Sequence, residues 1–280
     1  MSQLTRGRPT CIHAPRRESF RRIIVALAGS ALVAVGAVRA ASTPPLLVSA
    51  AASLTEPIQA LAQSFARQKG AETPRFNFAA SGVLQQQIQQ GAPVDVFLSA
   101  GPRPMDALQK AGLLLAGTRR NLIGNQLVLV VPSQSPIRSL SFSGLGSKAI
   151  GRIAIGDRTV PAGDYARQTL ASYKLTAAVE PKLVPLGSVR AVANAVAAGN
   201  VDAGIVYRSD ALQVAGLRIV AAAPPASHAP IRYQGAVLKA SRQPARARAF
   251  LDSLSTPAAH QVFLRHGFSP LPASSALESH

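Results

Sequence analysis

The feature that most constrains the fold is an alternation of short apolar runs with segments of helical periodicity, which begins at residue 46. Runs that predict strands lie at residues 46–50, 76–78, 94–99, 127–131, 153–155, 183–185 and 203–207. Segments that predict helices lie at residues 53–69, 83–90, 104–110, 164–173 and 189–198. Strands and helices in this order are typical of α/β proteins whose sheets are rich in parallel strands. We expect two such sheets.

The second half of the chain indicates how the sheets are connected. An Ala/Pro stretch at residues 221–226, continued by residues 228–230, predicts a connector. The chain then returns along residues 233–238 to two terminal helical patterns at residues 245–254 and 257–265. We therefore predict an α/β fold of two lobes, each a mixed sheet flanked by helices, joined by two crossings. The boundaries that we predict are 41–124 plus 230–280 for lobe 1 and 125–229 for lobe 2.

The N-terminal 40 residues predict an export signal. An arginine-rich stretch ends at Arg21 and Arg22, an apolar run follows at residues 23–38, and small residues surround Ala40. A charged region, an apolar region and small residues, in this order, are typical of a secretory signal peptide cleaved after Ala40. The alternative is a membrane anchor, but the run is short for a span and is interrupted by glycine and serine. We expect a periplasmic protein.

Net charge first suggests a polyanionic partner. The chain has 30 Lys and Arg against 12 Asp and Glu, for a formal charge of +18. Many of the arginines lie in the predicted signal segment, and the remaining basic residues are scattered. With no Trp and 4 Tyr, the chain also has few aromatic rings on which bases could stack. We expect no nucleic-acid partner.

Cysteine usage narrows the chemistry further. The single cysteine, Cys11, precedes the apolar run and would be lost with the signal peptide. The mature chain would then have no disulfide, no cysteine nucleophile and no thiolate metal site. No other apolar segment is long enough to span a membrane, so we expect a soluble mature chain.

The first informative motif follows the first predicted strand. Ser53 and Glu56 have the S-x-x-E spacing of a capping box, which predicts a helix N-cap at Ser53 and a helix end at Gly70. The preceding strand places this helix N-terminus at the carboxyl edge of a sheet, where open α/β folds bind ligands. On its residues alone, the motif fits either a simple helix cap or an anion site.

Three other junctions share small or glycine-flanked residues ahead of a predicted helix. They lie at residues 78–82, which include Ser81, at residues 160–163, and at residues 187–189. Each one alone fits ordinary turn chemistry. Together, the four junctions predict helix N-termini that converge on a fully ionised oxyanion, which can only accept hydrogen bonds. Such a site avoids the cost of burying a full cation.

Several blocks of the sequence resemble the periplasmic molybdate-binding proteins of ABC transporters, over about residues 46–268. The blocks are residues 50–55 (AAASLT), 78–81 (FAAS), 90–100 (QGAPVDVFLSA), 124–130 (GNQLVLV), 154–157 (AIGD), 160–166 (VPAGDYA) and 204–211 (GIVYRSDA). The resemblance implies a type II periplasmic-binding-protein fold, with two α/β lobes that close on a tetrahedral oxyanion. It implies molybdate or tungstate as the ligand, a membrane permease as the partner, and a monomer that needs no cofactor.

The resemblance also implies the ligand-binding residues. Two serine hydroxyls, two backbone N–H groups and a tyrosine fall on Ser53, Ser81, Ala162, Val189 and Tyr207. Without the resemblance, Tyr207 would be interpreted as a core residue at the end of a strand. The sequence departs from the family where Ala80 and Gly82 flank Ser81, since relatives are often richer in serine there. Asp164 is a second departure, which we interpret as a charge partner in a first helical turn and not as a ligand group.

Two other functions agree with parts of the sequence. A serine hydrolase would use Ser53 or Ser81 as nucleophile with His228, His260, His266 or His280 as base, but no G-x-S-x-G motif surrounds either serine. A binding protein for sulfate or another small oxyanion is the closer alternative. No H-x-x-x-H motif or carboxylate cluster indicates a metal cation site. We expect a binding protein with no catalytic residues.

Overall fold

The computed structural model describes residues 44–70 and 72–271. The predicted signal segment, residues 1–40, and His280 lie outside the described residues. Within the described residues, ten strands form two five-stranded sheets, and the strand and helix alternation predicts the presence of two sheets. None of the described helices has the length and apolar character that crossing a membrane requires.

The first sheet has the strand order β2-β1-β3-β10-β4. Its strands are β1 (Leu47–Ala51), β2 (Arg75–Ala79), β3 (Val96–Ser99), β4 (Arg120–Gly124) and β10 (Arg232–Val237). β1 pairs in parallel with β2 and β3, whereas β10 is antiparallel to β3 and β4. β3 is buried at every position, as expected for an inner strand covered on both faces. β2, at the edge of the sheet, is only partly buried.

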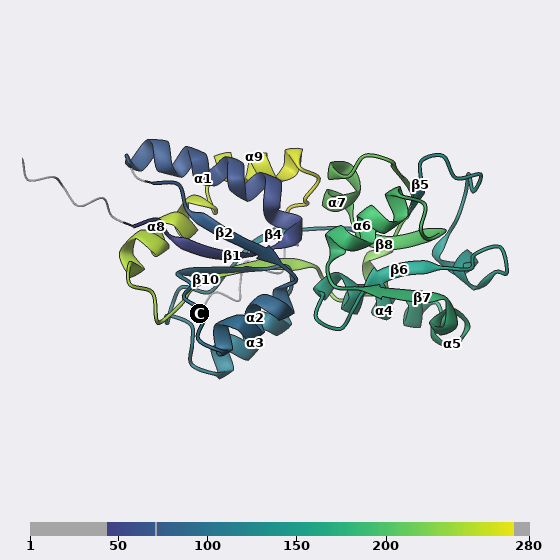
Figure 1. Cartoon of the computed structure of the whole chain (residues 1–280), viewed down its shortest axis with the longest axis horizontal. Coiled ribbons are helices and arrows are strands. Elements are labelled where there is room, and N and C mark those ends of the chain that lie inside the picture. Colours follow the sequence, from purple (N-terminus) through teal and green to yellow (C-terminus); the bar gives the residue numbers. More distant parts are fainter. Residues whose placement is uncertain (1–43, 71, 272–280) are drawn as a thin grey trace, which may run out of the picture. The chain divides into compact units, whose positions relative to one another are not determined.

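Helices cover both faces of this sheet (Figure 1). α1 (Thr55–Lys69), α8 (Pro244–Ser253) and α9 (Pro257–Arg265) lie on one face, and α2 (Ser81–Gln89) and α3 (Pro102–Lys110) lie on the other. Phe65 of α1 and Phe250 of α8 meet edge to face, with ring centroids 5.3 Å apart. The terminal helices therefore pack on the first sheet, as the sequence predicts. Gly70 ends α1 with φ +56°, a conformation that glycine adopts without strain.

The second sheet has the strand order β7-β6-β8-β5-β9. Its strands are β5 (Leu127–Pro132), β6 (Ile153–Gly156), β7 (Leu183–Leu186), β8 (Ala203–Tyr207) and β9 (Leu217–Ala222). β6 is parallel to β7 and β8, and β5 is antiparallel to β8 and β9, so this sheet is also mixed. α4 (Pro161–Ser172) and α5 (Thr176–Val179) lie on one side of it, and α6 (Val189–Ala197) and α7 (Arg208–Gln213) lie on the other (Figure 1).

Short 3₁₀ helices complete the elements. They are η1 (Ala52–Leu54), η2 (Phe142–Gly146), η3 (Glu180–Lys182) and η4 (Pro225–Ser227). The chain passes from the first sheet to the second after β4 and returns before β10, which gives the two predicted crossings. The lobe boundaries at 124/125 and 229/230 stay a prediction.

Four elements are absent from the sequence prediction. β4, β9, α5 and α7 have weak patterns, because β4 and β9 are partly exposed edge strands and α5 and α7 are too short to show a helical period. The connector predicted at residues 221–226 is therefore partly wrong, since Ala221 and Ala222 end β9.

The capping box predicted at Ser53 is also wrong. Ser53 lies in η1, α1 begins at Thr55, and no side chain caps α1. The Ser53 hydroxyl instead lies 2.8 Å from the Tyr233 hydroxyl, and the Glu56 carboxylate pairs with Arg190 of α6. Partners distant in the sequence have replaced the two local hydrogen bonds of a capping box.

Candidate oxyanion site

A small cavity lies where the carboxyl ends of strands meet the first turns of helices. It is lined by residues from η1, from the ends of β1 and β2, from Ala100 after β3, from the starts of α2, α4 and α6, and from the end of β8. All five predicted ligand residues line it: Ser53, Ser81, Ala162, Val189 and Tyr207. The centre of a water molecule can move within about 10 Å³ of this cavity, which is room for one water.

The two serines present their hydroxyls differently from ordinary helix caps. Ser81 is the first residue of α2 and is buried, and its Oγ accepts a hydrogen bond of 3.0 Å from the backbone N–H of Ala100. Because a backbone N–H can only donate, the Ser81 oxygen is the acceptor and its own proton is free to point elsewhere. Ser53 is equally buried and is paired with the hydroxyl of Tyr233.

Ala162 and Val189 lie in the first turns of α4 and α6. Val160 precedes α4 as its N-cap, and the N-cap of α6 is Ser188, whose side chain accepts a hydrogen bond from the Ala191 N–H. The first N–H groups of a helix have no partner within the helix, and the helix dipole adds positive potential there. Both helix starts are therefore suited to donating hydrogen bonds into the cavity that they line.

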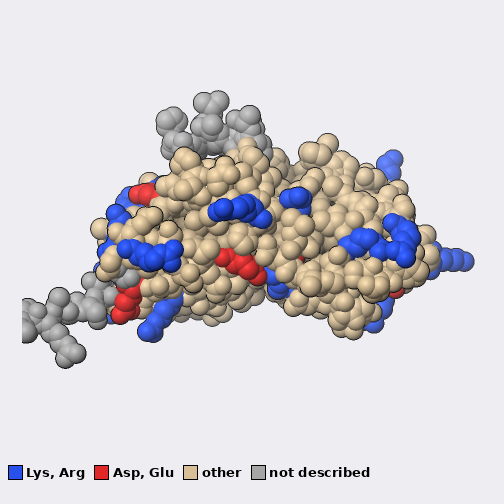
Figure 2. Space-filling view, turned by 90° about the horizontal axis from the view of Figure 1, so that it is seen from above, with Lys and Arg blue, Asp and Glu red and all other residues tan. Residues whose placement is uncertain are grey.

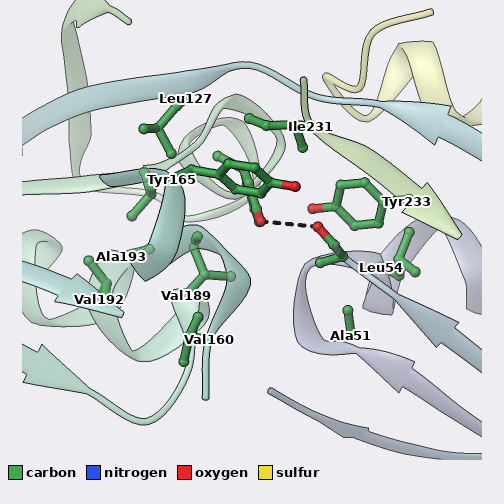
Figure 3. Packing of buried hydrophobic residues seen from close by; sticks show 14 of the residues in the cluster. Ala51, Leu54, Leu127, Val160, Tyr165, Val189, Val192, Ala193, Ile231 and Tyr233 are labelled. Atoms are coloured by element: carbon green, nitrogen blue, oxygen red, sulfur yellow. Dashed lines mark hydrogen bonds between the residues drawn. The ribbon is translucent and has the colours of Figure 1, made fainter. Parts of the chain in front are cut away.

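Tyr207 ends β8 and is buried. Its hydroxyl donates a 3.3 Å hydrogen bond to the carbonyl oxygen of Ala100, which follows β3 of the first sheet. Burial is the largest of the causes that raise the pKa of Tyr207 well above its ordinary value of 10. The phenol therefore keeps its proton at neutral pH and can act as a donor. Figure 3 shows Tyr165 and Tyr233 nearby, with their hydroxyl ends directed toward one another.

Charged groups lie around the cavity but not in its wall. Among the described residues that line it, none has a charged side chain. Asp164 pairs with Arg103 of α3, so its carboxylate is partly neutralised. Arg190, directly after Val189, donates a 2.8 Å hydrogen bond to Glu56 and lies 3.4 Å from Asp210. Both arginines are thus paired with carboxylates, and neither lines the cavity.

A larger cavity of about 530 Å³ adjoins the small one and shares Pro161 with it. Its wall includes Arg103, Asp106, Arg158 and Asp164, so it presents charges of both signs. Its two carboxylates are paired with Arg103 and Arg119, and a carboxylate offers a dianion no hydrogen-bond donor. The small cavity, lined by donors, is the better match to an oxyanion although it has far less volume.

The arrangement that a serine hydrolase would need is not present in the described part of the chain. His228 contacts the Ala229 carbonyl oxygen and His266 contacts Gln213. No hydrogen bond joins a described histidine to Ser53 or Ser81, whose partners are Tyr233 and Ala100. Within residues 44–70 and 72–271, no group of three or more His, Cys, Asp or Glu side chains is placed to hold a metal ion.

The positive charge of the chain is not concentrated at one place on the surface seen in Figure 2. Lys and Arg side chains are spread over this face, with acidic side chains between some of them. A nucleic acid is usually bound by a continuous basic patch or stripe, which this face does not present.

Solved structures define the class to which the fold belongs. The periplasmic molybdate-binding protein of Azotobacter vinelandii superposes with a TM-score of 0.71 at 27% identity, over 81% of this chain and 99% of that one. The sulfate-binding protein SubI of Mycobacterium tuberculosis superposes with a TM-score of 0.72 at 17% identity, over 84% of this chain and 89% of that one, which shows the fold alone. The two mixed sheets and their helices thus form the fold of type II periplasmic binding proteins.

Sequence comparison identifies the family. The profile of the bacterial extracellular solute-binding proteins matches residues 46–269. The molybdate-binding protein ModA of Escherichia coli is 36% identical over 255 residues, which cover 89% of this chain and 98% of that protein. The chain belongs to the family of bacterial extracellular solute-binding proteins, a family of transport proteins that bind their solute.

Three polar residues behind the cavity are not indicated by the sequence pattern. Tyr233, Asn125 and Ser209 are buried and are connected by hydrogen bonds that end at Ser53. Asn125 lies in a block that carries the family resemblance, but nothing in the local pattern predicts its partners. In the sequence, Tyr233 is marked only as the first residue of the predicted return strand.

Proposed function

We propose that this protein captures molybdate, and also tungstate, in the small cavity and delivers it to the membrane permease of an ABC transporter. The observation that carries the proposal is the meeting of hydroxyl groups and helix N-termini in a buried cavity without a charged side chain. In this role Ser53, Ser81, Ala162 and Val189 donate hydrogen bonds to the oxyanion, and Tyr207 does so when its hydroxyl turns from the Ala100 carbonyl oxygen to the ligand. The similarity to the molybdate-binding proteins of other bacteria supports the choice of ligand.

The remaining parts of the proposal concern the setting in which the protein acts. The chain acts as a periplasmic monomer after removal of residues 1–40, and it binds its ligand without catalysis. Its lobes are residues 41–124 plus 230–280 and residues 125–229. A tetrahedral anion needs more room than the one water that fits the cavity, so the walls move apart to admit it and close again around it.

We expect molybdate and tungstate to bind almost equally, sulfate much more weakly and phosphate most weakly. Molybdate and tungstate are dianions without a proton, whereas phosphate near neutral pH keeps a proton that would face donors in this cavity. Leaving that O–H group without an acceptor costs about 1 to 3 kcal/mol. Sulfate has shorter bonds, so several hydrogen bonds would be stretched at once in a cavity that closes on the larger anion.

Thermal unfolding with each anion measures this order, because the chain has no Trp for fluorescence. A ligand at a hundredfold excess over its Kd stabilises the folded state by about 2.7 kcal/mol. For a chain of this size, that raises Tm by roughly 5 to 10 °C. A sulfate shift equal to the molybdate shift would favour the alternative, a sulfate-binding protein. Ester hydrolysis abolished by Ser53→Ala would refute the proposal of a binding protein.

We expect Ser53→Ala and Ser81→Ala each to weaken molybdate binding by about ten- to a hundredfold. A hydrogen bond to a charged group contributes roughly 1.5 to 3 kcal/mol. Val189→Ala serves as the matched control, because Val189 contributes a backbone N–H that alanine retains, and it should change the affinity by less than about threefold. Calorimetric titration of the folded variants is the measurement. Equal losses in all three variants would contradict the assignment of side-chain and backbone donors.

A further inference from the structure

The direction of the hydrogen bond between Ser53 and Tyr233 is fixed by residues outside the cavity. The two hydroxyl oxygens are 2.8 Å apart and both residues are buried, so either oxygen taken alone could be the donor. If Ser53 is the donor, its proton points at Tyr233; if Tyr233 is the donor, the Ser53 proton can point into the cavity that Ser53 lines. An oxyanion that only accepts hydrogen bonds requires the second arrangement.

The hydrogen bonds of Asn125 determine which of the two hydroxyls is the donor. The backbone N–H of Gln126 donates a 2.9 Å hydrogen bond to the side-chain oxygen of Asn125, and a backbone N–H has no acceptor role. The Asn125 amide oxygen therefore faces Gln126, and its NH₂ group faces the other way. That NH₂ lies 2.9 Å from the Ser209 hydroxyl and 3.3 Å from the Tyr233 hydroxyl. Since an amide NH₂ only donates, the Tyr233 oxygen accepts from it.

The rest of the arrangement follows from counting protons. Tyr233 has one hydroxyl proton, its oxygen accepts from Asn125, and its other hydrogen-bond partner is Ser53. Burial raises the pKa of Tyr233 well above 10, so the proton is present at neutral pH. The Tyr233 ring packs edge to face on Phe268, with ring centroids 5.2 Å apart, and lies 5.7 Å from the ring centroid of Tyr207. The Ser53 oxygen thus accepts from Tyr233.

We propose that Asn125 and Tyr233 are positioning residues that turn the Ser53 hydroxyl into an obligatory donor toward the ligand. This inference rests on the proposed oxyanion-binding function and extends it to specificity. A serine whose proton points at the ligand favours an anion without protons over one that presents an O–H group. Asn125 lies in the first crossing between the sheets and Tyr233 follows the second, so the conformation of the crossings sets the direction of this donor.

Tyr233→Phe tests the proposal, because it keeps the ring and removes the donor. We expect the Kd for molybdate to rise about tenfold, the effect of one lost hydrogen bond. The Kd for phosphate should change by less than about threefold, since the freed Ser53 oxygen can then accept the phosphate proton. A purely structural loosening of the site would weaken both anions equally. Tyr173→Phe is the matched control: Tyr173 stacks on Phe142 away from the cavity and should bind as the unmodified protein does.

A double variant shows whether the effect passes through Ser53. In the Ser53→Ala background, Tyr233→Phe should change the Kd for molybdate by less than about twofold. Asn125→Ala is a second test in case Tyr233→Phe does not fold, because it leaves the tyrosine ring in place. It removes the hydrogen bond that orients the Tyr233 hydroxyl, and it should weaken molybdate binding severalfold. Full additivity with Ser53→Ala, or an unchanged Kd in both Tyr233→Phe and Asn125→Ala, would overturn the inference. Absence of molybdate binding by the unmodified protein would instead refute the proposed function.

Discussion

Replacing Asp210 with asparagine is expected to stabilise the protein at pH 8 and to leave its stability nearly unchanged at pH 4. Asp210 is fully buried on α7, and among the described residues its carboxylate oxygens make no hydrogen bond. Arg190 lies 3.4 Å away but is shared with Glu56, so it compensates the buried charge only in part. Burial raises the pKa of Asp210 from 3.8 to about 7, against the lowering effect of Arg190.

The direction in which stability changes with pH follows from the proton that Asp210 binds in the folded protein. Between pH 4 and pH 7 the folded protein holds a proton on Asp210 that the unfolded chain has lost, so the free energy of unfolding falls as the pH rises. The loss accumulates to about 4 kcal/mol and is complete above pH 7. Asparagine cannot ionise, so Asp210→Asn should avoid this loss.

Urea unfolding of both proteins across pH 4 to 8 measures the difference in stability. Asp252→Asn is the matched control, because Asp252 is exposed and pairs with Arg120 at the surface. It should change stability by less than about 1 kcal/mol at any pH. If Asp210→Asn were less stable than the unmodified protein at pH 8, the ion pair with Arg190 would outweigh the burial of Asp210.

Gly163→Ala is expected to lower both stability and ligand affinity strongly. Gly163 lies in the first turn of α4, next to Ala162, where the helix closely approaches the end of β6. A Cβ atom at Gly163 would lie 2.1 Å from the carbonyl oxygen of Gly156 and 2.7 Å from that of Asp157. Both are backbone atoms, so the start of α4 must move. Overpacking of this kind costs typically 1 to 3 kcal/mol, and we expect about 3 kcal/mol here.

The loss of affinity follows from the same displacement. If the start of α4 moves away from β6, the N–H of Ala162 no longer points correctly into the cavity, and we expect molybdate binding to weaken by about a hundredfold. Gly187→Ala, between β7 and α6, is the matched control, because a Cβ there meets only Asp157 Oδ2, at 3.9 Å. Urea unfolding and calorimetry would measure both effects. Equal changes in stability and in molybdate affinity in the two variants would show that the α4–β6 contact does not position Ala162.

The sequence by itself determined the elements that depend on neighbouring residues. Periodicity predicted the inner strands and the long helices, and Gly70 marked the end of α1, because these features depend on residues within a few positions of one another. Ser81 and Ser188 were recognisable at helix starts for the same reason. The family resemblance then supplied Tyr207, whose position at a strand end is uninformative alone.

Only the tertiary structure decided the direction of the donors. Ser53 and Glu56 match a local capping box, yet their partners are Tyr233 and Arg190, which lie 180 and 134 residues away. The hydrogen bond from Asn125 to Tyr233 spans 108 residues, and the pKa of Asp210 depends on its burial, on Arg190 of α6 and on Glu56 of α1. The direction of a hydrogen bond and the desolvation of a carboxylate depend on residues that are distant in the sequence and pack together only in the folded protein. A local sequence pattern therefore cannot predict them.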